Sequence, residues 1–168
     1  MYSAGETVIY GSLGVCKIKD IAKMSLGGES KVYCVLIPVN DIRSVVYVPT
    51  DNDILMSRIH PILSPDEVNI IICSAAPEKI EWINSDAERK QFCGETLKSG
   101  DRVRIMQMIA MLYERREVLR TQKKHFHITD ERFLKEAIKL LHEEFAYVLG
   151  IDTDEVPGYI ESRIKKSS

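Results

Sequence analysis

Short apolar runs rich in β-branched and aromatic residues recur through the first fifty positions, separated by breaks that contain glycine or asparagine. Runs of this length and composition between turn residues are typical of β-strands. They lie at 7–10, 15–18, 31–37 and 44–48, and Pro49 ends the last of them. Because no helical spacing occurs between the runs, this part is expected to fold as a small curled antiparallel sheet or SH3-like barrel.

A different pattern begins at residue 64, where apolar residues recur at intervals of three and four, as on one face of a helix. Two Ser-x-x-Glu capping boxes, beginning at Ser64 and Ser85, mark helix starts. Further boundaries are expected at Asp101, Thr129, Gly150 and Asp152 or Thr153. The helices are then predicted over roughly 65–73, 85–97, 101–120, 129–149 and 152–165.

These two patterns predict an α+β chain in two parts. Residues 1–55 are expected to form the small antiparallel β-barrel, residues 56–63 a connecting segment, and residues 64–168 a compact all-α bundle of about five helices. A barrel of about fifty residues has a marginal core, so it can dock on a partner or exchange strands with a second copy. A monomer and a strand-swapped dimer therefore both remain open.

The composition is that of an ordinary globular protein, with 45% hydrophobic and 29% charged residues. The N-terminus lacks the basic and apolar regions of a secretory signal, and no apolar stretch approaches the roughly 18 residues of a membrane span. The four cysteines share no C-x-x-C pattern: Cys16, Cys34, Cys73 and Cys93. These features predict a cytoplasmic protein with reduced thiols and no membrane association.

The net charge of −2 conceals a basic island. Residues 98–124 hold 8 basic and 3 acidic side chains, whereas the segments on both sides of this stretch are acidic. An island of this kind suggests a surface for a polyanion such as nucleic acid. A solvated helix face that happens to be basic explains the same pattern about equally well.

The sequence offers little for catalysis. It contains none of the common nucleotide-binding, serine-hydrolase or zinc-protease motifs. His125 and His127 could chelate a metal, but no third ligand accompanies them. The cysteines in apolar segments are expected to be buried, and nothing pairs Cys93 with a histidine. We therefore expect no enzyme, no catalytic residue, no cofactor and no metal site.

Trp82 is the single tryptophan and precedes the helix start at Ser85. One interpretation is a core anchor that ties this segment to the bundle. The other is an exposed aromatic ring that stacks on a base or enters a minor groove, with Ile80 and Ile83 providing the apolar anchorage instead. The residue type alone does not decide between them.

Short signatures in both parts carry a resemblance. In the first part they are 5–10 (GETVIY), Gly14-Val15, Ile18, Gly28, 33–36 (YCVL) and 46–49 (VYVP). In the second they are Trp82, Arg89, 97–101 (LKSGD) and 112–115 (LYER). In this order and at these distances, the chain resembles the CarD/CdnL family of bacterial regulators that bind RNA polymerase. The N-terminal module of that family is shared with transcription-repair coupling factors.

The resemblance implies a Tudor-like barrel that docks on the RNA polymerase β subunit and a helical domain that contacts promoter DNA at the upstream edge of the bubble. It implies that Trp82 lies against the minor groove and stabilises the open complex, while basic residues hold phosphates weakly and without sequence preference. The candidates for the DNA contact are Trp82, Arg89, Lys90, Lys98 and Arg102. The candidates for the polymerase contact, at an exposed strand edge, are Met24, Val46, Tyr47, Val48 and Pro49.

Some positions depart from the family pattern. Gly11 and Leu13 stand where the motif usually has Pro and His, and Met24 and Tyr47 stand where some members carry polymerase-contacting arginines. The change predicts a more apolar contact, a different polymerase surface or weaker docking. The alternative to a bridge between polymerase and DNA is an interaction module whose helices only oligomerise or scaffold.

Overall fold

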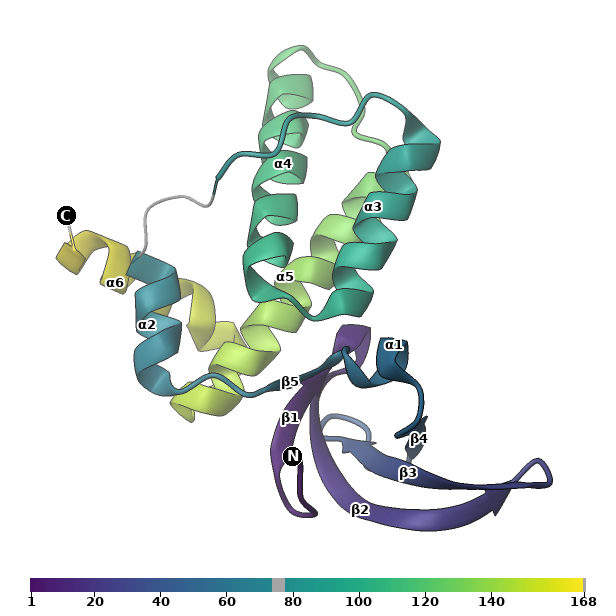
Figure 1. Cartoon of the computed structure of the whole chain (residues 1–168). Helices are drawn as coiled ribbons and strands as arrows, with labels where there is room; N and C mark the ends of the chain where they lie inside the picture. The colour runs from purple at the N-terminus through teal and green to yellow at the C-terminus, as the bar shows by residue number, and fades with distance from the viewer. Residues whose placement is uncertain (74–77, 168) are drawn as a thin grey trace. The chain divides into compact units, whose positions relative to one another are not determined.

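The fold is that of a computed structural model, which describes residues 1–73 and 78–167 (Figure 1). The chain divides into two compact units, Met1–Ile62 and Leu63–Ser168. The first is a five-stranded antiparallel sheet and the second is helical. The predicted α+β fold class, a small β part followed by a helical part, is therefore confirmed.

The sheet of the N-terminal unit has the strand order β4-β3-β2-β1-β5. Its strands are β1 (Thr7–Tyr10), β2 (Gly14–Leu26), β3 (Glu29–Pro38), β4 (Val46–Pro49) and β5 (Ile59–Pro61). A 3-10 turn, η1 (Gly11–Leu13), joins β1 to β2, and the short helix α1 (Asp53–Met56) follows β4. Figure 1 shows β2 as a long, strongly curved strand. The curved sheet encloses a core of Val8, Cys16, Ile18, Cys34, Leu36, Val48 and Ile59.

The β2–β3 hairpin is longer than the hydrophobic pattern predicts. Its tip is a two-residue turn in which Gly27 and Gly28 both have positive φ, at 66° and 90°. Such backbone angles at both positions suit the right-handed twist of the flanking strands and favour glycine. The pattern predicts most of β3 but misses the outer half of β2, because a bulge between Ile18 and Asp20 shifts the register and the β2 residues beyond it are mostly exposed.

The segment 56–63, predicted as a connection, contains β5. This strand pairs antiparallel with β1, and Ile59 contributes to the core of the sheet. Three residues are too few for a strand signature in the sequence, so only the pairing partner reveals the strand.

The helical unit contains α2 (Pro65–Cys73), α3 (Asp86–Ser99), α4 (Arg102–Thr121), α5 (Ile128–Leu149) and α6 (Val156–Ser167), with a 3-10 turn, η2 (Thr153–Glu155), before α6. Both predicted capping boxes lie at helix starts, with the Ser64 hydroxyl accepting from the Glu67 N–H and the Ser85 hydroxyl accepting from the Glu88 N–H. The start of α5 differs from the prediction, because the His127 side chain accepts the cap hydrogen bond and Thr129 donates it.

The core of the helical unit is built around Met108, Leu112, Leu134, Ala137 and Val156, all with 0% exposure. No helix in the described parts of the chain is long and apolar enough to cross a membrane.

Candidate functional site

Strand β4 forms one edge of the sheet, and its hydrogen-bond pattern determines what it offers to a partner. The Thr50 N–H donates to the Val32 carbonyl across 2.9 Å, which makes this a hydrogen-bonded pair. Bonded and non-bonded pairs alternate along an antiparallel ladder, so Val48 and Val46 also bond to β3. The N–H and C=O of Tyr47 consequently point away from β3 along the open edge.

The same register sorts the side chains of this region onto two faces. Tyr33 lies opposite Pro49 and Ala22, and its ring meets the Tyr47 ring edge-on with 6.4 Å between centroids. Met24, two residues along β2 from Ala22, shares this face. Tyr47 is 45% exposed. The predicted contact residues Met24, Tyr47 and Pro49 therefore lie on one face, which also carries Tyr33 and, opposite Met24, the ion-paired Lys31.

Val46 and Val48 do not belong to that face. Val48 is completely buried, and Val46 packs against the same core. The prediction of these two residues as partner contacts is corrected by the alternation of the strand, which turns every second side chain inward.

In the helical unit, Trp82 lies in the segment before α3 and is partly buried against the helical core. Its ring is flanked by two guanidinium groups, with the Arg89 carbon 4.3 Å and the Arg115 carbon 5.3 Å from the ring centroid. A cleft of about 330 Å³ lies beside the ring, lined also by Ile80, Met111 and Val118. Trp82 is thus anchored at one side and accessible at the other, so it combines features of both interpretations.

Arg89 is committed to the fold. It is only 4% exposed, and its guanidinium binds both oxygens of buried Asp130 at 2.9 Å. It also donates to the Ile83 carbonyl at 2.8 Å and to Asp86 at 2.6 Å. Burial alone would lower the pKa of Arg89, but these hydrogen bonds and charges outweigh burial and raise it. The prediction of Arg89 as a phosphate contact is corrected, because its donors are engaged inside the protein.

Arg102 is also committed to an internal contact. Its guanidinium forms a two-bond pair with Glu144, which is 2% exposed, at 3.0 and 2.6 Å. The same carboxylate accepts the Leu63 N–H at 3.2 Å, so the pair fastens α4 to α5 and to the beginning of the unit. Arg102 is therefore a structural residue, in contrast to its predicted role in DNA contact.

The remaining predicted basic residues lie far apart. Lys90 is exposed in the second turn of α3, on the side of the unit that carries Trp82. Lys98 is exposed in the last turn of that helix, which is about 12 Å further along its axis. The structure brings Lys90 into the neighbourhood of Trp82 and leaves Lys98 towards the opposite end.

The end of α4 gathers basic side chains that the prediction did not select. Figure 1 shows the beginning of α3, the end of α4 and the beginning of α5 at the same end of the helical unit. The basic residues there are Arg115, Arg116, Arg120, Lys123 and Lys124. We call Trp82, Lys90 and these five residues the basic end. The charge island of residues 98–124 contains these five residues, although the predicted DNA contacts do not include them.

Lys123 has an unusual backbone within the basic end. Its φ of 55° is the only positive value at a described non-glycine residue. The Lys124 N–H donates to the Leu119 carbonyl and the Lys123 N–H to the Arg120 carbonyl, which is the Schellman arrangement that glycine normally completes. A lysine here is strained, and strain of this kind is often retained at functional positions.

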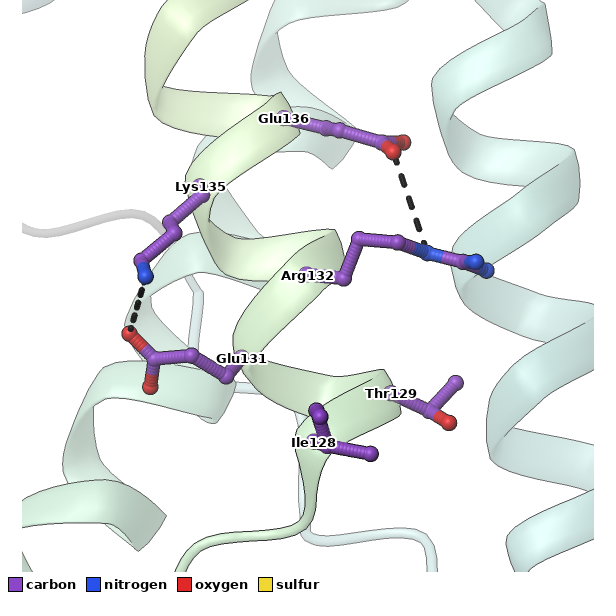
Figure 2. A pocket seen from close by; sticks show the side chains of 6 residues that line it. All are labelled: Ile128, Thr129, Glu131, Arg132, Lys135 and Glu136. Atoms are coloured by element: carbon purple, nitrogen blue, oxygen red, sulfur yellow. Dashed lines mark ion pairs between the residues drawn. The ribbon is translucent and has the colours of Figure 1, made fainter.

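The first turns of α5, beside the basic end, form a surface of paired charges (Figure 2). Figure 2 shows Arg132 directed towards Glu136 and Lys135 towards Glu131, at 3.8 and 3.7 Å. Ile128, at the start of the helix, is 82% exposed. The charges here are balanced within the surface, so it adds little to the positive potential.

Among residues 1–73 and 78–167, no group of three or more histidine, cysteine, aspartate or glutamate side chains is arranged to hold a metal ion. Burial raises the pKa of Cys16 to about 11 and that of Cys93 to about 12, so both thiols are protonated near neutral pH. Cys73 is exposed, which corrects the expectation that it is buried: it lies in the last position of α2, away from the packed face.

The architecture places the chain in the class of α+β proteins that join a small curled sheet to a helical bundle. Residues 2–60 match the model of the CarD-like/TRCF RID domain family, and the N-terminal unit is therefore a RID module of this kind. This assigns a transcription-related role with RNA polymerase interaction to the unit. No curated protein matches the chain.

Proposed function

We propose that this protein is a non-catalytic transcription regulator that bridges RNA polymerase and promoter DNA. The N-terminal unit binds the polymerase β subunit, and the basic end of the helical unit contacts DNA at the upstream edge of the melted bubble and stabilises the open complex. The observation that carries the DNA half is the half-buried Trp82 ring, held by Arg89 and Arg115 at the end that gathers the basic side chains. Such a protein acts in the cytoplasm.

The polymerase contact is proposed to be strand addition at β4. The outward N–H and C=O of Tyr47 match the donor and acceptor of an incoming strand. The aromatic face of Met24, Tyr33 and Tyr47 supplies apolar burial beside these hydrogen bonds. This contact is apolar where some relatives use arginines.

The DNA contact is proposed to combine Trp82 with phosphate-binding side chains. Lys90, Lys123 and Lys124 are exposed, and no carboxylate of the described ranges pairs with them within 4 Å. Their ammonium groups are proposed to bind DNA phosphates. Contacts of this kind are independent of sequence and sensitive to salt.

The DNA half is tested by the lifetime of open complexes on a weak promoter, measured at saturating protein with Trp82→Ala. We expect a lifetime that is about 5- to 150-fold shorter, since base–aromatic stacking contributes about 1–3 kcal/mol. The matched control is Tyr147→Ala, which removes another partly exposed ring, 41% accessible, from the later part of α5. An unchanged lifetime with Trp82→Ala at full polymerase occupancy would favour the alternative of a scaffold without DNA contact.

The polymerase half is tested by pull-down with purified RNA polymerase. Tyr47→Ala removes the ring, whereas Tyr47→Pro also removes the outward N–H, which forms no bond to β3. We expect Tyr47→Pro to fold and to bind about two- to tenfold more weakly than Tyr47→Ala, the worth of one hydrogen bond. Val48→Pro is the control that breaks the internal ladder and unfolds the sheet. Equal binding by Tyr47→Pro and the unaltered protein would exclude strand addition at this edge.

A further inference from the structure

The helical unit contains a second concave region, which meets the basic end at Tyr113, whose ring lies 5.0 Å from the guanidinium carbon of Arg116. It is a cavity of about 490 Å³ between α2, α4, α5 and α6. Leu141 and Phe145, which are 8% and 3% exposed, reach its lining from α5. Small-molecule sites in proteins commonly have volumes of about 300–1,000 Å³. The volume of this cavity lies within that range.

The chemistry of the lining is nearly uniform. Of the 12 residues that surround the cavity, only Tyr113 and His142 have polar side chains, and none is Asp, Glu, Lys or Arg. A charged ligand would lose its hydration there without gaining a counter-charge. Burial lowers the pKa of His142, so its imidazole is neutral near pH 7 and offers one donor and one acceptor. The apolar lining thus favours an uncharged ligand, and His142 and Tyr113 favour one polar atom at one end of that ligand.

We propose that this cavity is a binding site for an uncharged, predominantly apolar small molecule, whose single hydrogen-bonding group faces His142 and Tyr113. This function is separate from polymerase and DNA binding and does not rest on either.

The arrangement of the lining favours a small molecule over a helix from a partner. The lining residues come from four helices, and on α4 they run from Met106 to Tyr113, about 10 Å along the helix axis. An amphipathic helix docks in a groove that is open along its length. Here α2 and α6 supply further walls through Ile71 and Ile160, so the space is confined on several sides.

The test uses two fluorescent probes with related ring systems and different charge. N-phenyl-1-naphthylamine is neutral, and 8-anilino-1-naphthalenesulfonate carries a sulfonate. With the full chain, we expect saturable one-site binding of the neutral probe and at least tenfold weaker binding of the sulfonate. No saturable binding of the neutral probe, or equal affinity for both, would overturn the proposal.

A substitution locates the site. Ala110→Phe places a ring in the cavity and is expected to weaken binding of the neutral probe at least tenfold. The matched control, Ala87→Phe, adds the same ring at an exposed position of α3 outside the cavity and should leave the affinity unchanged.

Because Ala110→Phe could disturb folding, methyl NMR of isoleucines in the unaltered protein gives a second measurement. The neutral probe should shift the methyl signals of Ile71, Ile138 and Ile160, which line the cavity, and leave those of Ile42 and Ile54 in place. Shifts confined to residues outside the cavity would overturn the assignment.

Discussion

The internal network of Arg89 leads to a prediction that separates a structural role from a DNA-contacting role. In Arg89→Met, Asp130 loses the partner of both its oxygens while remaining in a site where it is only 3% exposed. The Ile83 carbonyl also loses its 2.8 Å donor. Removing one member of a buried ion pair costs about 3–5 kcal/mol, mainly because the other charge is left unpaired.

This loss is large compared with the total stability of a domain, which is typically about 5–15 kcal/mol. With a urea dependence of about 2 kcal/mol per molar, the unfolding midpoint of the helical unit should fall by roughly 2 M. The measurement is urea unfolding of the full chain, followed by far-UV circular dichroism, in which the helical unit dominates the signal.

Two further variants make the interpretation specific. Lys90→Met removes an adjacent, exposed positive charge, and we expect it to change stability by less than about 0.5 kcal/mol. The double substitution Arg89→Met with Asp130→Leu removes both charges and should recover most of the loss. If Arg89→Met unfolds at the same urea concentration as the unaltered protein, the network does not stabilise the fold and this reasoning fails.

Three other predictions concern single side chains. Lys123→Gly removes the steric cost of the left-handed backbone and should stabilise the helical unit by about 1 kcal/mol in urea unfolding. It should also weaken salt-dependent DNA binding, because a positive charge is lost. Lower stability of this variant would show that the backbone at residue 123 is not strained. Burial lowers the pKa of folded His142, so its contribution to stability is present above about pH 6.5 and lost as the pH falls below that value. His142→Gln should flatten this dependence, and an identical pH profile in the variant would contradict the assignment. Iodoacetamide should modify exposed Cys73 first, with buried Cys16 and Cys93 protected until unfolding; mass spectrometry that finds Cys93 modified as fast as Cys73 would contradict the burial.

The elements that could be predicted from the sequence are those whose signal lies within a few neighbouring residues. Ser64 and Ser85 mark helix starts in the sequence because a capping hydrogen bond joins residues only three positions apart. The strand β5 and the outer half of β2 could not be predicted in this way. Their formation depends on pairing with β1 and on continuation past a bulge, and neither leaves a hydrophobic period in the sequence.

The candidate site could be predicted only in part, because the sequence shows which side chains are charged but not which opposite charge each of them contacts in the fold. Arg89 and Lys90 are neighbours with the same charge, yet one is buried and the other exposed. The difference depends on Asp130, which is 41 positions away in the chain. Arg102 has the same relation to Glu144, 42 positions away. Ion pairs between residues far apart in the sequence therefore determine which basic side chains remain available to bind a phosphate.

The buried network of Arg89 also bears on the proposed role of Trp82. A ring that supports a melted bubble must be held in one orientation before DNA arrives, since ordering a flexible side chain on binding reduces affinity. Arg89 lies 4.3 Å from the Trp82 ring and is fixed by Asp130, Asp86 and the Ile83 carbonyl. Its buried network is a rigid support for the aromatic side chain. Arg89 would then affect DNA only by positioning Trp82, so Arg89→Lys should shorten open-complex lifetime without changing the salt dependence, whereas Lys124→Ala should change the salt dependence.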